Sequence, residues 1–431
     1  MSDAGAAGPD ARAVDARAPR ALSSRLIPIA CGAVLLAVLA GLAYNLIGFP
    51  GLRAIGDYYR IDLDVYRLGG GVFMSGTPLY GEMPPTALGN TLPFTYPPIS
   101  AVIFGPLSLM SLHWAGIVVT CLSLALLFGT IVLTLVSLGY SPRTLLLWAA
   151  GAVFAAAMIL EPVFSTFDYG QINIVLMAFV AADCLPRKTP WPRGLLIGFV
   201  AAVKLTPAVF VLFFLFRKDF RAAVVSGISF LAFTALGFAA TFSDSLQYWT
   251  KVLVDSDRIG RPAYPANQSI TGMLARLGLD ETIRSVGWIA LSLVLLGVTF
   301  YAMRRAFAAH QTALALGVNA MFGLLVSPVS WSHHWVWTVP LLVALGTLAY
   351  RTRNVVALGF VGIGAVVLHF APHWQLAVGR WSGLGWPLWD QVVASSYVWW
   401  GTAAIVVAAW ATRPSTRLDR TTEKATDLEP A

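Results

Sequence analysis

Long apolar runs recur along the whole of this sequence and limit what it can fold into. A helix that crosses a lipid bilayer needs roughly 20 mostly apolar residues, sometimes as few as 17. Only 12% of the 431 residues are charged, whereas an average soluble domain has about 25%. Runs of suitable length lie at 26–48, 114–138, 144–160, 220–241, 284–303, 311–327, 335–350, 354–371 and 394–411, and shorter ones at 171–185, 194–203 and 206–216. The sequence therefore predicts an all-α polytopic membrane protein with about 12 transmembrane helices.

Basic residues give the chain a formal net charge of +8. In a soluble protein this charge could indicate nucleic-acid binding, but here the Lys and Arg residues lie at the ends of apolar runs, as membrane proteins place them. One further apolar stretch, 97–112, begins with Pro97 and Pro98, and we expect it to lie along the interface without crossing. Most basic residues then fall in short loops on the inner side, as the positive-inside rule requires. We therefore predict membrane lipids as partners and no nucleic acid.

This topology divides the chain into one membrane domain and two tails. We expect a single transmembrane domain at 25–412, with disordered cytoplasmic tails at 1–24 and 413–431. The first outer loop, 49–113, should carry juxtamembrane helices. Nearly all the unusual polar residues fall in this loop and in the other outer loops, so the outer face is expected to be the active face.

Asp62 and Asp64 stand two residues apart in the first outer loop. Residues two apart on a helix are separated by about 200° around its axis. If 57–67 is helical, the two carboxylates point in nearly opposite directions, so one can face a site while the other caps, pairs or meets solvent. A metal-binding Asp-X-Asp pattern and a solvated loop edge are the alternatives.

Two further segments of this loop are assigned structural roles. The glycines at 69–71 lack the Gly-Lys-Ser/Thr of a P-loop, and they predict a flexible turn between interfacial helices. Phe94 and Tyr96 fit an aromatic belt at the membrane interface.

Polar residues gather between 165 and 173, where one apolar run ends and the next begins. Polar groups at membrane depth are costly unless they line a cavity or bond internally, and a capping turn needs only one or two of them. We therefore expect this segment to form a wall of the site. Its candidate site residues are Asp168, Tyr169, Gln171 and Asn173.

Cationic and imidazole side chains of the outer loops are candidates for binding a phosphate or an acceptor. They are Lys204, Arg258, Arg261, His333 and His334. Lys204 lies between two apolar runs, where an amine is costly unless it is solvated or paired with an anion. Snorkelling is the alternative for Lys204, and interfacial packing is the alternative for the histidines. No metal-ligand spacing surrounds the histidines, so the sequence gives little support to a metal role for them.

A carboxylate beside phosphate-binding cations at the interface suits group transfer from a lipid-phosphate donor. The carboxylate can take the proton of an attacking hydroxyl, and the cations can stabilise the negative charge on a departing phosphate. A secondary transporter is the alternative from another class, although the two halves of the chain show no repeat.

Six segments in this order resemble those of a known family of membrane enzymes. They are "DLDVY", "LPFTYPPISAVIF", "STFDYGQINIVLM", "VKLTPA", "NQSITGMLARL" and "LVSPVSWSHHWVW". Together they are similar to the polyprenol-phosphate-mannose-dependent mannosyltransferases of the GT-C superfamily, glycosyltransferase family 87. The similarity is closest to the α-1,2-mannosyltransferases of phosphatidylinositol mannoside biosynthesis.

The resemblance implies an essential Asp in the first outer loop, which is Asp62 here, with Asp64 as a supporting neighbour. It implies inverting transfer of mannose from a polyprenyl-phosphate donor to a glycolipid acceptor, a phosphatidylinositol mannoside, on the periplasmic side of the plasma membrane. It also implies a GT-C-type fold for the transmembrane domain at 25–412, and with Asp62 as the base we predict no metal and no cofactor. Lipomannan or lipoarabinomannan as the acceptor, and arabinose as the sugar, stay open, as does the oligomeric state.

Overall fold

The computed structural model describes residues 26–46, 59–141, 143–255, 260–376 and 386–412. Within these ranges every regular element is a helix, and an isolated antiparallel bridge joins Asn267 to Trp331. This confirms the all-α prediction. The predicted terminal tails lie outside the described residues, and so does Arg258.

The predicted apolar runs correspond to helices. These are α1 (Leu26–Leu46), α4 (Leu112–Ser137), α5 (Arg143–Ala157), α7 (Asn173–Cys184), α8 (Leu195–Val203), α9 (Val211–Arg217), α10 (Phe220–Ala240), α13 (Glu281–Ala308), α14 (Thr312–Val326), α15 (Thr338–Arg351), α16 (Val355–Phe370) and α18 (Ser396–Ala411). The connections hold shorter helices, which are α2 (Ile61–Met74), α3 (Pro98–Ser108), α6 (Glu161–Tyr169), α11 (Phe242–Thr250), α12 (Ile270–Arg276), α17 (Leu388–Ala394), and the 3-10 helices η1 (Thr206–Phe210), η2 (Val252–Val254), η4 (Ser332–Trp337) and η5 (Pro372–Gln375).

The expected number of crossings, about 12 from run length, is not confirmed. Among the described residues, α4, α10 and α13 are each long and apolar enough to cross a membrane, and two bent pairs could add two further spans. The pair α5 and α6 bends by 73°, and the pair α17 and α18 by 65°. Several other apolar runs form helices of 10–17 residues, which are shorter than a typical membrane span.

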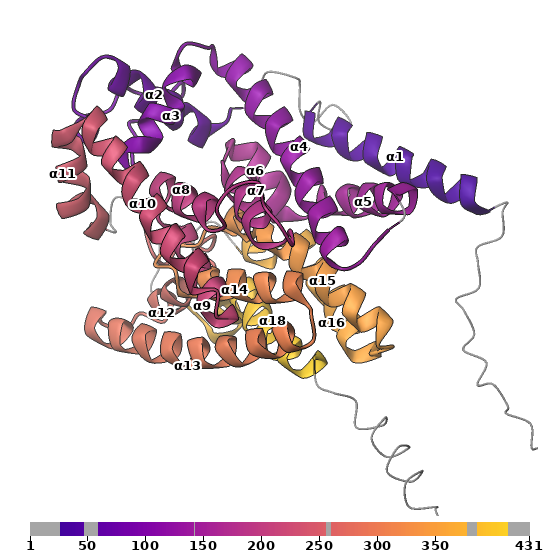
Figure 1. Cartoon of the computed structure of the whole chain (residues 1–431). Helices are drawn as coiled ribbons and strands as arrows, with labels where there is room; N and C mark the ends of the chain where they lie inside the picture. Colours follow the sequence, from indigo (N-terminus) through magenta and orange to yellow (C-terminus); the bar gives the residue numbers. More distant parts are fainter. Residues whose placement is uncertain (1–25, 47–58, 142, 256–259, 377–385, 413–431) are drawn as a thin grey trace, which may run out of the picture.

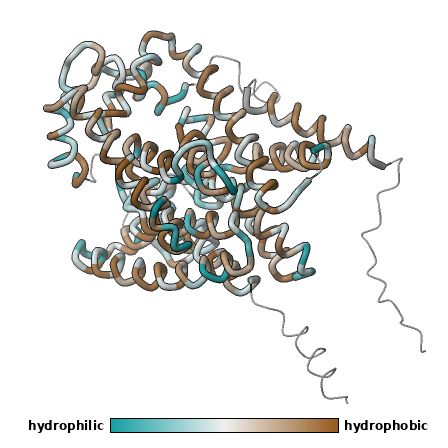
Figure 2. Tube along the Cα trace, in the orientation of Figure 1, coloured by the Kyte–Doolittle hydropathy of each residue, from teal (hydrophilic) through white to brown (hydrophobic). Residues whose placement is uncertain are grey.

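The long helices expose apolar side chains over much of their length. Ile228 and Leu231 of α10, and Leu293 and Val294 of α13, are each more than 60% exposed. Figure 2 shows apolar residues along these helices. Continuous exposed apolar surface of this kind is rare on soluble proteins and marks contact with lipid or a partner. Together with the span lengths it identifies an integral membrane protein.

Helices α2 and α3, which lie in the segment predicted as the first outer loop, pack against each other beside α11 (Figure 1). The flexible turn predicted at residues 69–71 is wrong, because these glycines continue α2 to Met74. A Cβ atom at Gly70 would lie 2.6 Å from the backbone oxygen of Phe104 in α3. The glycines therefore allow two helices to approach closely.

Phe94 and Tyr96 do not form the predicted interfacial belt. Phe94 is completely buried and Tyr96 is 8% exposed. Their rings lie 6.0 Å apart, and each also contacts Phe104 of α3. The two aromatic residues therefore belong to the core that joins the outer loop to the rest of the fold.

Small residues bring α8 and α10 together. A Cβ atom at Gly198 would lie 2.3 Å from the backbone oxygen of Ser226, and 2.5 Å from the Cβ of Ser229. Such contacts are typical of helix pairs in membranes, where close backbone packing replaces the hydrophobic effect. The pairing matters for the site because Lys204 directly follows α8.

Candidate active site

The two carboxylates of α2 have separate partners. Asp64 is 2% exposed; it accepts hydrogen bonds from Arg67 Nη1 at 3.1 Å, from the Ala87 backbone N–H at 2.8 Å and from Tyr59 Oη at 3.3 Å. It ties α2 to the following loop. Asp62 is partly exposed and faces Gln171 and Lys204 instead.

The environment of Asp62 suits a group that exchanges a proton near neutral pH. Burial raises the pKa of Asp62 to about 6, while a hydrogen bond from Gln171 and the positive charge of Lys204 oppose the rise. A carboxylate with a pKa in this range is mostly ionised at pH 7 and can accept a proton readily.

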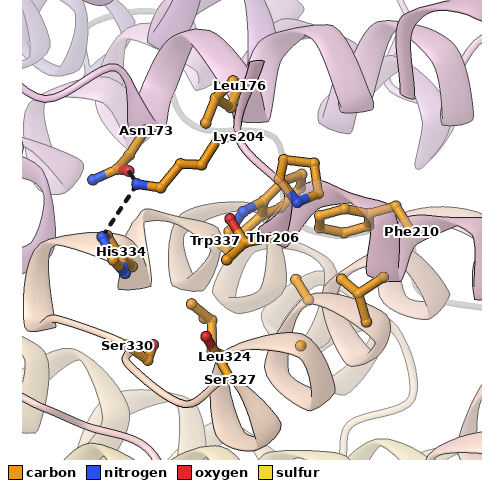
Figure 3. Close-up of a pocket in the computed structure, with 14 residues that line it drawn as sticks. Asn173, Leu176, Lys204, Thr206, Phe210, Leu324, Ser327, Ser330, His334 and Trp337 are labelled. Atoms are coloured by element: carbon orange, nitrogen blue, oxygen red, sulfur yellow. Dashed lines mark hydrogen bonds between the residues drawn. The ribbon is translucent and has the colours of Figure 1, made fainter. Parts of the chain in front are cut away.

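Lys204 lies in the connection between α8 and η1, with extended backbone angles. Its Nζ atom lies 3.4 Å from Asn173 Oδ1, 3.4 Å from His334 Nε2 and 5.2 Å from the centroid of the Tyr96 ring (Figure 3). Burial lowers the pKa of Lys204 to about 8, and the negative charge of Asp62 opposes this shift. The ammonium group therefore points into the protein and does not snorkel away from it.

The hydrogen bonds of His334 leave a place for an anion beside Lys204. His334 Nδ1 accepts the Trp331 backbone N–H at 3.2 Å. Burial, together with the charge of Lys204, holds the pKa of His334 well below its usual range. A neutral imidazole that accepts at Nδ1 carries its hydrogen on Nε2. Lys204 Nζ, which also donates to Asn173 Oδ1, and His334 Nε2–H thus meet at 3.4 Å as two neighbouring donors.

A cleft opens at this pair of donors (Figure 3). Its polar end is formed by Asn173, Lys204, Ser327, Ser330 and His334, and its other wall is apolar. The apolar residues are Leu176, Pro207, Val209, Phe210, Ala320, Leu324 and Trp337. The cleft therefore offers cationic and apolar surface side by side, as an amphiphile with an anionic group requires.

The backbone of η4, which carries both histidines, is held from α6 and α7. The His333 carbonyl oxygen accepts Thr166 Oγ1 at 2.9 Å and Asn173 Nδ2 at 3.0 Å. The His333 ring lies between the rings of Tyr169, at 4.9 Å, and His334, at 4.8 Å. The predicted wall residues Tyr169 and Asn173 therefore meet the predicted histidines.

Glu161, at the start of α6, accepts four hydrogen bonds, three of them from distant parts of the chain. It is 1% exposed. Its carboxylate accepts Ser165 Oγ at 2.6 Å, Ser332 Oγ at 2.7 Å, Tyr397 Oη at 2.9 Å and Trp374 Nε1 at 3.1 Å. Sequence reasoning missed Glu161, because an acidic residue in the first turn of a helix is also the ordinary choice for a helix start.

A buried strap joins the loop before α12 to the loop before η4. Asn267, Gln268 and Ser269 are completely buried. Asn267 Oδ1 accepts the Ser330 backbone N–H at 3.0 Å, and Asn267 Nδ2 donates to the Pro262 carbonyl oxygen at 3.0 Å. The strap fixes the position of Ser330, a residue of the cleft wall.

The remaining predicted site residues are Asp168, Arg258 and Arg261. Arg261 is exposed, and Arg258 lies outside the described residues. Asp168 lies near the C-terminal end of α6 and is partly exposed. Among the residues that the structure describes, no three His, Cys, Asp or Glu side chains come together as a metal site. That the site uses no metal stays a prediction.

A helical membrane fold with a carboxylate beside a cationic, partly apolar cleft defines a candidate membrane-bound transferase. The model of glycosyltransferase family 87 matches residues 94–328, more than half of the chain, and the protein belongs to this family. The match confirms the resemblance found in the sequence and replaces the transporter alternative.

Curated relatives carry more specific names. The chain is 44% identical, over 87% of its own length and 90% of the relative's, to a polyprenol-phosphate-mannose-dependent alpha-(1-2)-phosphatidylinositol mannoside mannosyltransferase of Mycobacterium tuberculosis. A Mycolicibacterium smegmatis protein of the same name is 44% identical over 83% of this chain and 85% of its own. A phosphatidylinositol pentamannoside mannosyltransferase of M. smegmatis is 33% identical over 86% of this chain and 92% of its own. No solved structure shows a significant match.

Proposed function

We propose that this chain transfers mannose from polyprenol-phosphate-mannose to a phosphatidylinositol mannoside and forms an α-(1-2) linkage. Relatives that carry this name are 44% identical to the chain, whereas a relative named for a pentamannoside acceptor is 33% identical. This difference favours the acceptor of the first group. The distribution of basic residues supports both termini in the cytoplasm and the site on the periplasmic side of the plasma membrane.

Asp62 is the base in this reaction. Its carboxylate takes the proton of the acceptor hydroxyl while the hydroxyl oxygen forms a bond to the anomeric carbon of mannose. The bond from this carbon to the phosphate oxygen breaks, and its electron pair leaves with the phosphate. One such displacement inverts the anomeric centre, so a β-linked donor gives an α-linked product and a single carboxylate suffices.

The observation that carries the proposal is the meeting of two donors at the polar end of an apolar cleft. Lys204 Nζ and His334 Nε2–H are placed so that both can donate a hydrogen bond to one shared anion. A phosphate there would receive charge-assisted hydrogen bonds as its negative charge grows in the transition state. The wall formed by Phe210, Leu324 and Trp337 suits the first units of a prenyl chain.

The test is a transfer assay in proteoliposomes with two donors offered separately, polyprenol-phosphate-mannose and GDP-mannose. Phosphatidylinositol mannosides with few mannoses and a pentamannoside are the acceptors. We expect transfer from the lipid donor alone, with the shorter acceptors preferred. Asp62→Asn should abolish transfer. Asp280→Asn is the matched control, because Asp280 caps α13 and Asn caps a helix equally well.

Three results would contradict parts of this proposal. Transfer from GDP-mannose would exclude the lipid-linked donor. Preference for the pentamannoside would exclude the acceptor. Transfer that persists in a folded Asp62→Asn variant would place the base elsewhere.

A further inference from the structure

A network of buried hydrogen bonds lies next to Asp62. Tyr66 Oη donates to Gln171 Oε1 at 2.7 Å, and Tyr96 Oη lies 2.8 Å from Tyr66 Oη and 3.3 Å from Gln171 Oε1. Tyr66, Tyr96 and Gln171 are 1%, 8% and 6% exposed. Tyr66 follows Asp62 by four residues on α2, so the two side chains lie on the same face of the helix.

The two ends of the Gln171 amide have different roles in this network. The side chain of Gln171 has an oxygen that only accepts and an NH2 group that only donates. Because two phenol hydroxyls approach its oxygen, the NH2 group is turned to the other side, where it meets the Asp62 carboxylate. The flipped amide would turn its oxygen toward the carboxylate, and two acceptors would then face each other. The hydroxyls can accept as well as donate, so the carboxylate decides which end of the amide faces it, and the hydroxyls hold the oxygen end in place.

The surrounding aromatic core keeps the two hydroxyls in place. The Tyr66 ring stacks on Phe104 of α3 with centroids 4.4 Å apart, and it meets the Tyr96 ring edge-on at 5.3 Å. Neither ring can turn its hydroxyl away from Gln171 without disturbing close packing.

We propose that Tyr66 and Tyr96 are positioning residues, which orient the Gln171 amide so that its NH2 group holds the Asp62 carboxylate in place for the acceptor hydroxyl. The proposal rests on the role given to Asp62 above. It assigns a function to Tyr96, which the sequence placed in a predicted interfacial belt, and to Tyr66, which the sequence did not single out.

The other charged groups around Asp62 do not depend on this amide. Lys204 and the phenol of Tyr59 interact with its charge. Helix α3 has no acidic or basic residue, α4 carries only His113, and α6 carries Glu161 and Asp168. Replacing the tyrosines with Phe leaves all of these groups in place.

The test measures the protonation of Asp62 without relying on catalysis. A water-soluble carbodiimide with an added amine modifies the protonated carboxyl group, and peptide mass spectrometry gives the extent at Asp62 for each pH. The hydrogen bond from Gln171 favours the ionised form, so its loss should raise the pH of half-modification. A hydrogen bond to a charged group is worth about 1.5–3 kcal/mol, which corresponds to about one pH unit or more.

Three variants separate positioning from a general loss of packing. Tyr66→Phe/Tyr96→Phe keeps both rings and should shift the half-modification pH upward, and so should Gln171→Met. Tyr80→Phe is the control, because it removes a buried hydrogen bond of the same aromatic core without touching the amide. In the Gln171→Met background the tyrosine changes should add no further shift, since they act through Gln171.

An unchanged half-modification pH in the tyrosine variant would overturn the proposal, as would an equal shift in Tyr80→Phe or full additivity with Gln171→Met. Mannosyl transfer is then measured across pH in the same variants. The lower-pH limb of kcat/KM should move with the modification midpoint. If the variants show the expected modification shifts but the wild-type protein transfers no mannose, the proposed function alone is refuted, so the two failures are distinguishable.

Discussion

Glu161 offers a sharp test of how the fold supports the site. Its carboxylate is the common acceptor for donors from α6, η4, η5 and α18, and Ser332, one of these donors, directly precedes the two histidines of η4. We compare two changes at this position. Glu161→Gln keeps the shape of the side chain, whereas Glu161→Ala removes the acceptor.

The expected costs follow from the partners. In Glu161→Ala the indole N–H of Trp374, which can only donate, loses this acceptor at a cost of about 1–3 kcal/mol, and the loss of bonds to a charged group adds to it. The total should be about 3–5 kcal/mol. In Glu161→Gln the oxygen can replace Oε1. Tyr397 Oη can then accept the new NH2 group and donate to the Leu368 carbonyl oxygen, which lies 3.4 Å away. This change should cost about 1 kcal/mol.

The assay is the apparent unfolding midpoint of purified protein in detergent, followed by transfer activity below that temperature. For a chain of this length the midpoint falls roughly 1 °C per kcal/mol. Glu161→Ala should therefore lose about 3–5 °C and most of its activity, while Glu161→Gln keeps both nearly unchanged. Glu281→Ala, at an exposed position in α13, is the control and should stay within about 0.5 kcal/mol of wild type. Equal losses in the Gln and Ala variants would refute the reasoning, because charge alone would then explain the effect.

Further predictions concern the site and the helix packing. Transfer should rise with pH through about 6 as Asp62 ionises, and fall through about 8 as Lys204 loses its proton; a pH profile that is flat between 5 and 9 would contradict this assignment. Lys204→Gln should raise the KM for the lipid donor about 10- to 100-fold, from the loss of one charge-assisted bond, whereas an unchanged KM would place the phosphate elsewhere. Gly198→Ala should destabilise the protein by about 1–3 kcal/mol through the clash with Ser226, while Gly227→Ala, whose Cβ meets nothing within 4 Å, should not lower the midpoint.

Local patterns predicted much of the helical layout. Apolar runs located the helices to within a few residues, and Pro97 and Pro98 marked the start of α3. The breaks were harder to read. The glycines at 69–71 fit a turn by propensity, and only the close approach of Phe104 shows why they stay in a helix. Tertiary contact therefore overrode local preference at that position.

The site was predictable only where unusual residues marked it. Asp62, Lys204 and Asn173 stood out because polar groups in apolar surroundings need a reason. Glu161 and Tyr66 gave no such signal. The partners of Glu161 in η4, η5 and α18 lie 171 to 236 residues further along the chain, and no local pattern reveals contacts of that separation. The hydroxyl of Tyr66 gains its meaning only from Gln171.

Glycosylation of Asn267, in the buried strap at 267–269, would report whether the protein has folded. The sequence of the strap, Asn-Gln-Ser, is formally an acceptor for N-linked sugar, and such acceptors need a side-chain amide that an enzyme can reach. In the folded chain Asn267 Nδ2 already donates to Pro262, and the whole side chain is enclosed. If a host that glycosylates such sequences produces this protein, a sugar on Asn267 would identify the molecules that were modified before residues 267–269 became buried.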